Sequence, residues 1–206
     1  MSAKYAEKIE LETKVCSRCK EEKPVKDFAL HHKYGYQWYC RNCDAESKSA
    51  YEQTPQGKAS RVNRNGRNRV TRNNTFADIT NGQVRVLIER FNSCMYCGKS
   101  LTMKTLQIDH VVPMSFAGPH RIDNLVVCCG ECNRVGGKGD MSIFEYYRQN
   151  EDFTMERLEV IINYLAELSG QSKLDIFQDM LWEDMLYCAS KKGFRPKISR
   201  TLIEYD

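Results

Sequence analysis

The fold of this chain is decided by residues 94–133, which read CMYCGKSLTMKTLQIDHVVPMSFAGPHRIDNLVVCCGECN. Two Cys-x-x-Cys pairs, Cys94 with Cys97 and Cys129 with Cys132, stand at the two ends of this stretch. Each pair puts two thiolates on one tight turn, and two such pairs complete a tetrahedral zinc site with Zn–S distances of about 2.3 Å. Two pairs are a far stronger signal than one. The spacing therefore predicts that zinc staples this stretch.

A second set of paired cysteines lies nearer the N-terminus and has the same spacing within each pair. Its members are Cys16, Cys19, Cys40 and Cys43. His31 and His32 lie between the pairs and are alternative ligands, although four cysteines already suffice. In the first stretch Cys128 competes with Cys129, and only Cys129 keeps the two-residue spacing to Cys132. We therefore expect two structural zinc ions, each held by four cysteines.

Bulk composition limits the class of protein. The chain has 206 residues and 41% hydrophobic residues, enough for one medium domain or two to three small ones. No apolar run approaches the roughly 20 residues that span a bilayer, and Met1–Glu12 is mixed in charge, unlike a signal peptide. Disulfides are the alternative for the cysteines. Paired Cys-x-x-Cys turns without a signal peptide instead favour reduced, metal-bound thiolates and a cytoplasmic location.

The net charge of +4 is unevenly distributed. Residues 141–206 contain 8 Lys and Arg against 12 Asp and Glu, a net charge of −4. The preceding 140 residues, which contain the paired cysteines, therefore have a net charge of +8. A basic front part predicts an anionic partner there, whereas the C-terminal part is typical of a solvated helical unit.

The pattern predicts an α+β fold in four parts. Residues 1–50 form an N-terminal zinc module with so few hydrophobic residues that metal must supply much of its stability. Residues 51–79 form a basic connector that is nearly devoid of apolar residues, so it is not expected to order by burial. It either orders along a phosphate backbone or is a solvated tether, and its arginines favour DNA contact. They are Arg61, Arg64, Arg67, Arg69 and Arg72.

Residues 80–140 contain the small zinc-stapled core. Thr80 and Gln83 fit a capping box that opens a helix with apolar residues from Val84 to Phe91. Strands are predicted at residues 106–110 and 125–129, followed by a turn of helix near Asn133. Residues 141–206 form a C-terminal helical region: Ser142 and Glu145 fit a capping box, and two apolar stripes follow. The stripes are Leu158, Ile161, Ile162, Leu165 and Leu168, and Leu174, Phe177, Leu181, Met185 and Cys188.

The order Cys-x-x-Cys, strand, Asp-His, loop, Asn, strand, Cys-x-x-Cys-Asn resembles the HNH endonuclease family, the ββα-metal nucleases. The segments that carry the resemblance are Cys94–Gly98, Ile108–Pro113, Asp123–Cys129 and Glu131–Asn133. It covers residues 80–140. More loosely, the N-terminal module resembles a zinc module that precedes the nuclease domain in many phage HNH proteins. The resemblance implies a ββα-metal core and a bacterial cell or phage-infected host as the setting.

The residues themselves fit phosphodiester hydrolysis. That reaction needs an activated water and stabilisation of charge on the phosphate and the leaving oxygen. His110 is a candidate general base because the ordinary pKa of histidine lies near neutral pH. Asp109 points to the opposite face of the strand. With Asn133 it offers the oxygen ligands that Mg²⁺ prefers, with Mn²⁺ as an alternative. A zinc closed by four thiolates is not itself expected to be catalytic.

The resemblance assigns further roles. It implies that His110 is the first family histidine and the base, that Asn124 braces the loop and orients His110, and that Asn133 holds the third position. The chain thus has an H-N-N variant of the motif, and an inert member of the family is the alternative. It also implies products with 5′-phosphate and 3′-hydroxyl ends. Asp109 is expected to bind metal rather than only cap a turn.

Residues beside the proposed metal site complete the predictions. Arg121, Arg134 and Lys138 are expected to contact DNA phosphates, with simple solvation as the alternative. His120 is expected at the surface, with a phosphate contact as the alternative. The predicted function is a metal-dependent DNA endonuclease. The rival from another class is a zinc-dependent DNA-binding protein without catalysis. Within the class, a sequence-specific restriction or homing and nicking enzyme competes with a junction resolvase, and a palindromic site would need a homodimer.

Overall fold

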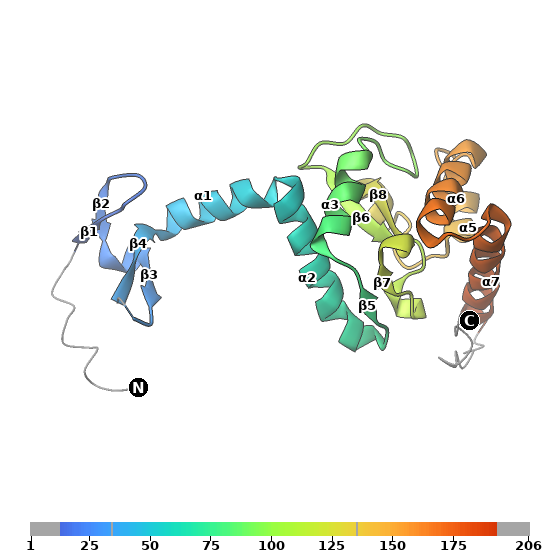
Figure 1. Cartoon of the computed structure of the whole chain (residues 1–206), viewed down its shortest axis with the longest axis horizontal. Helices are drawn as coiled ribbons and strands as arrows, with labels where there is room; N and C mark the ends of the chain where they lie inside the picture. The colour runs from blue at the N-terminus through green and yellow to red at the C-terminus, as the bar shows by residue number, and fades with distance from the viewer. Residues whose placement is uncertain (1–12, 34, 135, 193–206) are drawn as a thin grey trace. The chain divides into compact units, whose positions relative to one another are not determined.

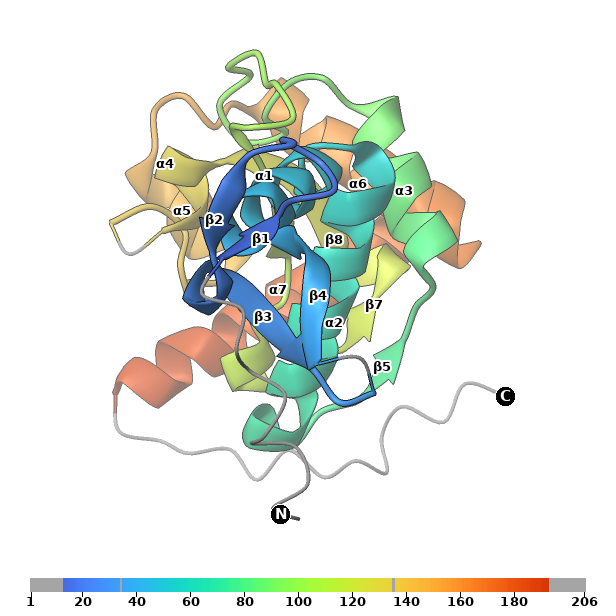
Figure 2. The same cartoon turned by 90° about the vertical axis from the view of Figure 1, so that its left-hand side faces the viewer.

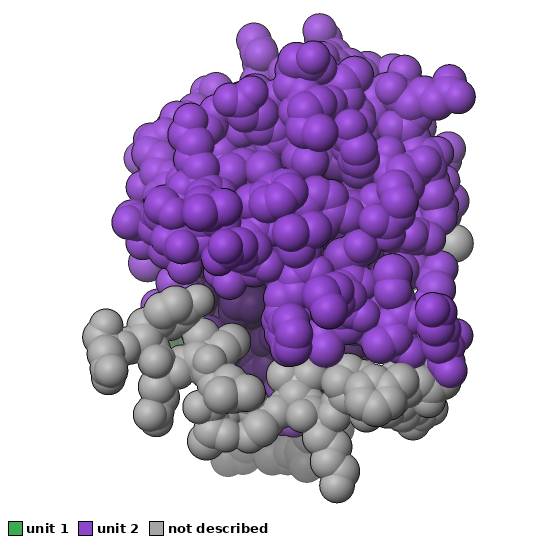
Figure 3. All heavy atoms as spheres, turned by 90° about the vertical axis from the view of Figure 1, so that its right-hand side faces the viewer, with its two compact units in different colours: residues 1–54 green, residues 55–206 purple. Residues whose placement is uncertain are grey.

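The computed structural model describes residues 13–33, 35–134 and 136–192. The chain divides after Thr54 into two compact units, residues 1–54 and 55–206. Figure 3 shows one face of the second unit in purple. The expectation for Met1–Glu12 falls outside the described residues, as do residues 193–206 of the predicted C-terminal helical region. Each unit is considered by itself below.

Unit 1 is built from two small antiparallel hairpins and one helix (Figure 2). Strand β1 (Thr13–Val15) pairs with β2 (Glu22–Pro24). After the short 3₁₀ helix η2 (Val25–Asp27), β3 (Phe28–His31) pairs with β4 (Gly35–Cys40), which leads directly into α1 (Arg41–Glu52). The buried core consists of Cys16, Phe28 and Cys40, with Tyr36, Tyr39 and Cys43 packed against it. A core this small agrees with the expectation that metal stabilises the module.

Unit 2 is centred on the antiparallel pair β6 (Leu106–His110) and β8 (Leu125–Cys129), as the sequence predicted (Figure 1). Every residue of β8 is buried. The register places Leu106 opposite Cys129 and His110 opposite Leu125. Helix α4 (Gly130–Asn133) follows β8 at once. The end of β6 and the start of α4 are therefore positioned by one hairpin.

Helix α3 (Asn81–Arg90) begins with the predicted capping box. The Thr80 hydroxyl accepts from the Gln83 amide, and the Gln83 side chain accepts from the Thr80 amide. Val84, Leu87 and Ile88 are buried on the inner face. The sequence predicted this helix correctly because the capping box and the spacing of its apolar residues both involve residues within one or two helical turns.

The sequence suggested an irregular basic connector at residues 51–79. In the structure this segment is mostly helical. Helix α2 (Pro55–Asn73) belongs to unit 2 and packs on α3. Its inner face has small or polar residues instead of large apolar ones, and these are buried: Gly57, Lys58, Ala59, Asn63 and Gly66. The ammonium of Lys58 donates to the carbonyl of Leu106, 2.6 Å away. Close backbone approach and buried hydrogen bonds, rather than an apolar stripe, thus stabilise the helix.

Short elements connect β6 to β8. The chain passes through η3 (Met114–Phe116), then β7 (His120–Arg121), then η4 (Ile122–Asn124). Strand β7 pairs in parallel with β5 (Ala77–Asp78), the segment between α2 and α3. The loop that follows the Asp-His dipeptide is therefore fixed at its middle to the segment that follows α2.

Three helices complete unit 2: α5 (Ile143–Gln149), α6 (Met155–Ser169) and α7 (Lys173–Lys191). The stripe predicted for α6 lies in the core except for Leu168, which is exposed. For α7 the predicted stripe was wrong at three of its five positions, whereas Phe177 packs against the core and Cys188 is partly buried. Leu174, Leu181 and Met185 are exposed, whereas the buried residues are Ile176, Met180 and Tyr187. The apolar residues of α7 surround much of the helix, so periodicity alone did not identify the inner face.

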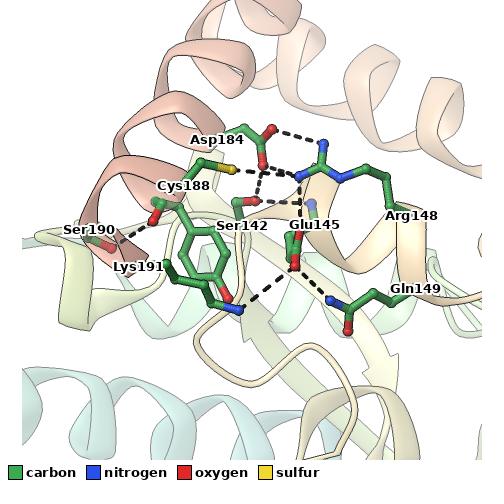
Figure 4. A network of polar contacts seen from close by, with 9 residues as sticks. Ser142, Glu145, Arg148, Gln149, Asp184, Cys188, Ser190 and Lys191 are labelled. Atoms are coloured by element: carbon green, nitrogen blue, oxygen red, sulfur yellow. Dashed lines mark hydrogen bonds and ion pairs between the residues drawn. The ribbon is translucent and has the colours of Figure 1, made fainter. Parts of the chain in front are cut away.

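A network of polar contacts joins α7 to α5 (Figure 4). Ser142 caps α5 by accepting from the Glu145 amide at 3.0 Å, and its hydroxyl also contacts Asp184 of α7. The Glu145 carboxylate turns to Arg148 instead of back to the cap, so the predicted capping box is only half formed. Arg148 also donates to both oxygens of Asp184. These charged contacts are one reason why the inner face of α7 is not purely apolar.

The α+β fold with two four-cysteine clusters agrees with the sequence prediction. No helix among the described residues is long and apolar enough to cross a bilayer.

Candidate active site

Each predicted set of cysteines forms a cluster suited to a metal ion. The Sγ atoms of Cys16, Cys19, Cys40 and Cys43 lie within 4.8 Å of one another, and so do those of Cys94, Cys97, Cys129 and Cys132. The Sγ atoms of Cys97 and Cys129 are 3.8 Å apart, close to the roughly 3.8 Å edge of a tetrahedron with Zn–S distances of about 2.3 Å. Both donor sets therefore fit zinc. Neither His31 nor His32 belongs to a cluster, and Cys128 is buried outside one.

Backbone amides support the second cluster. The amide of Cys97 donates to Sγ of Cys94, and the amide of Cys132 donates to Sγ of Cys129 at the start of α4. A hydrogen bond from the Cys132 thiol lowers the pKa of Cys94 to about 4. Cys94 is thereby stabilised as the thiolate, the form that binds metal. Burial raises the pKa of Cys97, and the bond to Cys94 raises that of Cys132. A closed cluster at this corner fixes the end of β8 and the start of α4 against the Cys94–Cys97 turn.

Asp109 lies at the end of β6 and points into the protein. Its Oδ2 atom accepts from the Tyr96 hydroxyl at 2.8 Å and lies 3.1 Å from Nζ of Lys138. Tyr96 is fully buried between Tyr146 and Phe153, and burial raises its pKa, so it remains a donor. Both contacts use Oδ2. Oδ1 therefore has no hydrogen bond or ion pair within the described part of the chain.

Lys138 does not face solvent, so the prediction that it contacts DNA phosphates is wrong. Its side chain is 0% exposed. The ammonium donates to the carbonyl of His110 at 2.8 Å as well as pairing with Asp109, and its backbone amide donates to the carbonyl of Cys132. The chain folds back after α4 and buries this lysine beneath the Asp-His dipeptide. Lys138 thereby compensates the charge of Asp109.

His110 points away from Asp109, as alternation along a strand requires. It is 9% exposed, and its Nε2 lies 3.1 Å from Nδ1 of His120. His120 was expected at the surface, but it is 0% exposed. Burial, with the charge of His120 and nearby cations, lowers the pKa of His110 to about 3. Burial and the charges of Arg67 and Arg69 lower the pKa of His120 to about 4. Both rings are therefore neutral near neutral pH.

Asn124 fastens the loop that follows His110. Its Oδ1 accepts from the amide of Val112 at 2.8 Å, and its Nδ2 donates to the carbonyls of Val112 and Pro119. Its own carbonyl accepts from the amide of Val111. Asn124 is buried, with 4% exposure. This geometry is what a loop brace requires, because one side chain ties both ends of the loop.

Asn133 comes from α4 and reaches the face of β6 that carries Asp109. Its Nδ2 donates to Oε1 of Gln107 at 2.7 Å, and residues two apart on a strand share a face. Asn133 and Asp109 do not contact each other directly. Each nevertheless has an oxygen, Oδ1, without a partner among the described residues. A carboxylate and an amide oxygen are a suitable donor set for Mg²⁺ or Mn²⁺, which would keep several waters.

The arginines of α2 differ in their partners and in their electrostatic effect on the two histidines. Arg61, Arg64 and Arg72 are exposed and lie on one face by their helical spacing. Arg67 is partly committed to structure, since it donates to Asn63 and to the carbonyl of Ile79. Arg69 is exposed, and its charge acts on both His110 and His120. It is therefore the arginine of α2 best placed to meet a phosphate near His110.

The remaining predicted cations lie near the loop and α4. Arg121 pairs with Asp123 at 2.6 Å, which reduces its availability to a phosphate. Arg134 is exposed at the C-cap of α4. Sequence reasoning missed Tyr96 and His120 as partners of the Asp-His dipeptide. The only local signal for Tyr96 was its place inside a Cys-x-x-Cys turn, and His120 had none.

Comparisons with known proteins match the segment that contains this site. The family model for the HNH endonuclease matches residues 94–140. The CRISPR-associated endonuclease Cas9 of Actinomyces naeslundii is 44% identical over 43 residues, which are 20% of this chain and 4% of that protein. The crystal structure of the Type II-C Cas9 enzyme from the same organism matches 72% of this chain and 14% of that one, with 21% identity and a TM-score of 0.33. This chain thus spans a small part of that relative's length. Residues 94–140 thus match the HNH endonuclease family, to which the aligned relative gives independent support.

Proposed function

We propose that this protein is a metal-dependent HNH endonuclease that hydrolyses phosphodiester bonds of duplex DNA at specific sequences, as a restriction or a homing and nicking enzyme. The observation that carries the proposal is the arrangement of four residues on the β6–β8 hairpin, within the segment that matches the family. Asp109, His110 and Asn124 lie where β6 ends and β8 begins. Asn133, from α4 at the other end of β8, bonds to Gln107 on the face of β6 that carries Asp109. A DNA-binding protein without catalysis would need neither a histidine poised as a base nor a buried carboxylate beside it.

His110 is the proposed general base. Its ring is neutral near neutral pH, because burial lowers its pKa to about 3, so a ring nitrogen is available to accept a proton from water. Asn124 holds the adjoining loop and limits where His110 can move. The hydroxide oxygen attacks phosphorus, and the 3′ oxygen leaves with the bonding electrons, giving 5′-phosphate and 3′-hydroxyl ends.

Asp109 and Asn133 are the proposed ligands of a catalytic Mg²⁺ or Mn²⁺ ion. When bound, such an ion stabilises negative charge on the phosphate and on the leaving oxygen. Tyr96 and Lys138 hold Oδ2 of Asp109, which leaves Oδ1 as the proposed ligand atom. Gln107 holds the amide nitrogen of Asn133, which leaves the amide oxygen as the ligand atom.

Four basic residues are the proposed contacts to the DNA backbone near the site. Arg64, Arg69 and Arg72 are exposed on α2, and Arg134 is exposed after α4. Within the described residues, none of the four side chains makes a hydrogen bond or ion pair, so each can bind a phosphate without first breaking a contact. Arg61, Arg67 and Arg121 are secondary candidates. Such contacts supply affinity and register, whereas sequence choice needs contacts with base edges.

The four-part division of the chain, with zinc in both cysteine clusters, is part of the proposal. Zinc at residues 16–43 would fold a module that extends contact with DNA. Zinc at residues 94–132 would fix the corner from which Asn133 projects. The setting proposed is the cytoplasm of a bacterium or of a phage-infected cell, where thiols stay reduced.

The decisive experiment is cleavage of supercoiled plasmid DNA by the purified, zinc-loaded protein with Mg²⁺ or Mn²⁺. We expect nicked or linear DNA from the wild type and at least a 100-fold lower rate from His110→Ala, because general base catalysis typically contributes that much. His32→Ala is the matched control, since His32 is exposed in unit 1, and it should retain full activity. DNA binding, measured with Ca²⁺ in place of Mg²⁺, should survive in both variants.

The same assay separates the alternatives. Binding without any cleavage by the wild type would instead identify a zinc-dependent DNA-binding protein. Sequencing the product ends from a mixed substrate distinguishes discrete sites, which mean restriction or homing, from cuts confined to branched DNA, which mean a junction resolvase. Linear products that appear without a nicked intermediate would support a homodimer acting on both strands.

A further inference from the structure

We propose that His120 is a positioning residue for His110, held in place by helix α2 through Gly66. This inference rests on the proposed function, because it assigns His110 a partner in the same reaction. His120 lies ten residues after His110, in the middle of the loop that Asn124 braces. It is fully buried, although the sequence around it, Gly-Pro-His-Arg, is typical of an exposed turn.

The backbone at His120 is fixed from two sides. Its amide donates to the carbonyl of Phe76 at 2.8 Å, and it pairs with Ala77 in the short parallel ladder of β5 and β7. Asn124 donates to the carbonyl of the preceding residue, Pro119, at 2.9 Å. The imidazole of His120 therefore projects from a backbone with little freedom to move.

Gly66 fixes the other side of the ring. A Cβ atom built on Gly66 would lie 2.1 Å from Nε2 of His120, 2.3 Å from Cε1 and 2.4 Å from Cδ2. Every other residue type would therefore displace the ring or the helix. Glycine inside a helix costs about 1 kcal/mol relative to alanine. Its presence lets the backbone of α2 rest directly on the imidazole, as an ordinary side chain would not allow.

The ring so held makes one hydrogen bond, to the proposed base. Nδ1 of His120 lies 3.1 Å from Nε2 of His110. This bond restricts His110 to one ring orientation. Since a neutral imidazole carries one N–H, one of the two bonded nitrogens is the donor and the other the acceptor. Nδ1 of His110 has no partner among the described residues and is not enclosed. We assign Nδ1 as the nitrogen that accepts the proton, so that Nε2–H donates to His120.

This arrangement gives His120 a role during the reaction. When Nδ1 takes a proton from water, His110 becomes an imidazolium, and its Nε2–H bond to the neutral His120 becomes charge-assisted and stronger. The hydroxide oxygen bonds to phosphorus, and the 3′ oxygen departs with the electron pair and takes a proton from solvent. His120 itself neither gains nor loses a proton, and its Nε2, which is buried without a partner, has no route to solvent.

The first test compares two substitutions of His120 in the full-length, zinc-loaded protein. His120→Leu removes the hydrogen bond and retains bulk. His120→Asn keeps a polar atom near the position of Nδ1. We expect His120→Leu to lower kcat for plasmid nicking about 10- to 100-fold, the usual effect of removing a partner that orients a functional histidine, with KM changed less than about twofold. His120→Asn should recover most of this loss. Equal kcat for the two variants would overturn the proposal, because packing alone would then explain the burial of His120.

The second test does not depend on cleavage. In protein with ¹⁵N-labelled histidines, the His110–His120 bond should give a nitrogen–nitrogen scalar coupling, and the ¹⁵N shifts should identify His110 as the Nε2–H tautomer. Gly66→Ala should abolish the coupling, whereas Gly82→Ala should not, since a Cβ there meets only Thr80, 3.8 Å away. Absence of the coupling in the wild type would overturn the inference. A wild type that shows the coupling but never cuts DNA would overturn the proposed function instead and leave the pairing intact.

Discussion

The two cysteine clusters have the same ligands and spacing within each pair, yet they lie in opposite surroundings. The cluster of unit 1 is itself most of a core, because the buried residues there are Cys16, Phe28 and Cys40. In unit 2 the thiols are embedded in a large apolar core that extends through β8, α3 and α6. One sequence signature thus serves two physical purposes. A metal in unit 1 replaces a core that the chain is too short to build, whereas a metal in unit 2 fixes a corner beside the candidate site.

The difference also concerns charge. The ion pairs described in unit 1 lie at the surface, such as Lys48 with Asp44. Unit 2 buries a charged pair, Lys138 with Asp109, and two neutral histidines close to it. Burial of polar groups costs free energy unless they are paired. The large core of unit 2 can offset such a cost, and the small core of unit 1 cannot.

The largest expected effect comes from breaking one cluster at a time. We expect Cys40→Ser to unfold residues 13–54, because structural zinc contributes about 10–16 kcal/mol in small modules and little else stabilises this unit. Residues 55–192 should stay folded. Cys132→Ser should instead leave the helices of unit 2 folded and disturb α4 and its neighbours. Amide NMR spectra of the zinc-loaded variants would show which unit loses its dispersed signals.

Cys188→Ser is the matched control for these substitutions, since Cys188 belongs to neither cluster and should keep both units folded. A dispersed spectrum for residues 13–54 in Cys40→Ser would contradict the comparison, because unit 1 would then be stable without a complete cluster.

An intermediate effect is expected at the buried ion pair. Lys138→Met should lower the free energy of unfolding of unit 2 by about 3–5 kcal/mol, since it leaves the carboxylate of Asp109 buried without its cation. Urea unfolding followed by the helical circular dichroism signal would measure the change. Lys48→Met in α1 is the counterpart in unit 1. It should cost less than about 1 kcal/mol, because Lys48 and Asp44 form an exposed pair.

A double substitution sharpens this prediction. Asp109→Asn combined with Lys138→Met removes both charges, so the double variant should be more stable than Lys138→Met alone. If the double variant were less stable than either single variant, Lys138 would be stabilising the protein through packing or its bond to the His110 carbonyl, and the ion pair would be secondary.

Features with local signals were predictable from the sequence. Both clusters follow from the two-residue spacing of cysteines. Strand β6 follows from alternation, β8 from a short apolar run that leads into Cys129, and α4 from its place at the last ligand pair. The cap of α3 depends on two residues in one turn. In each case the pattern that predicts the element lies within a few residues, although the clusters and the β6–β8 pair join more distant segments.

The remainder depends on contacts between distant segments. The inner face of helix α2 consists mainly of glycine and polar residues, which do not predict a helix from sequence alone. The helix depends on its packing against α3 and against the loop around His120. Lys138 and His120 have polar side chains in turn-like sequences, and their burial follows from how those turns fold back on β6 and α2. The face of α7 was misjudged for a similar reason, since Ile176 and Met180 are buried by partners that periodicity does not reveal.

The smallest predicted effect is a pH dependence of stability. It tests whether the buried histidines make the stability of unit 2 sensitive to mildly acidic pH. The pKa of His120 is lowered from 6.5 to about 4 in the folded protein, first by burial and then by Arg67 and Arg69. The unfolded chain therefore binds more protons between these values, so stability is complete above pH 6.5 and falls as the pH decreases toward 4. At pH 5 the free energy of unfolding should be about 2 kcal/mol lower than at neutral pH because His120 is protonated only in the unfolded chain. Urea unfolding at pH 7.5 and pH 5 should accordingly show a smaller loss for His120→Leu than for the wild type. Loss of zinc at low pH affects both proteins equally, so equal losses in the two would mean that His120 is already protonated or exposed in the folded state.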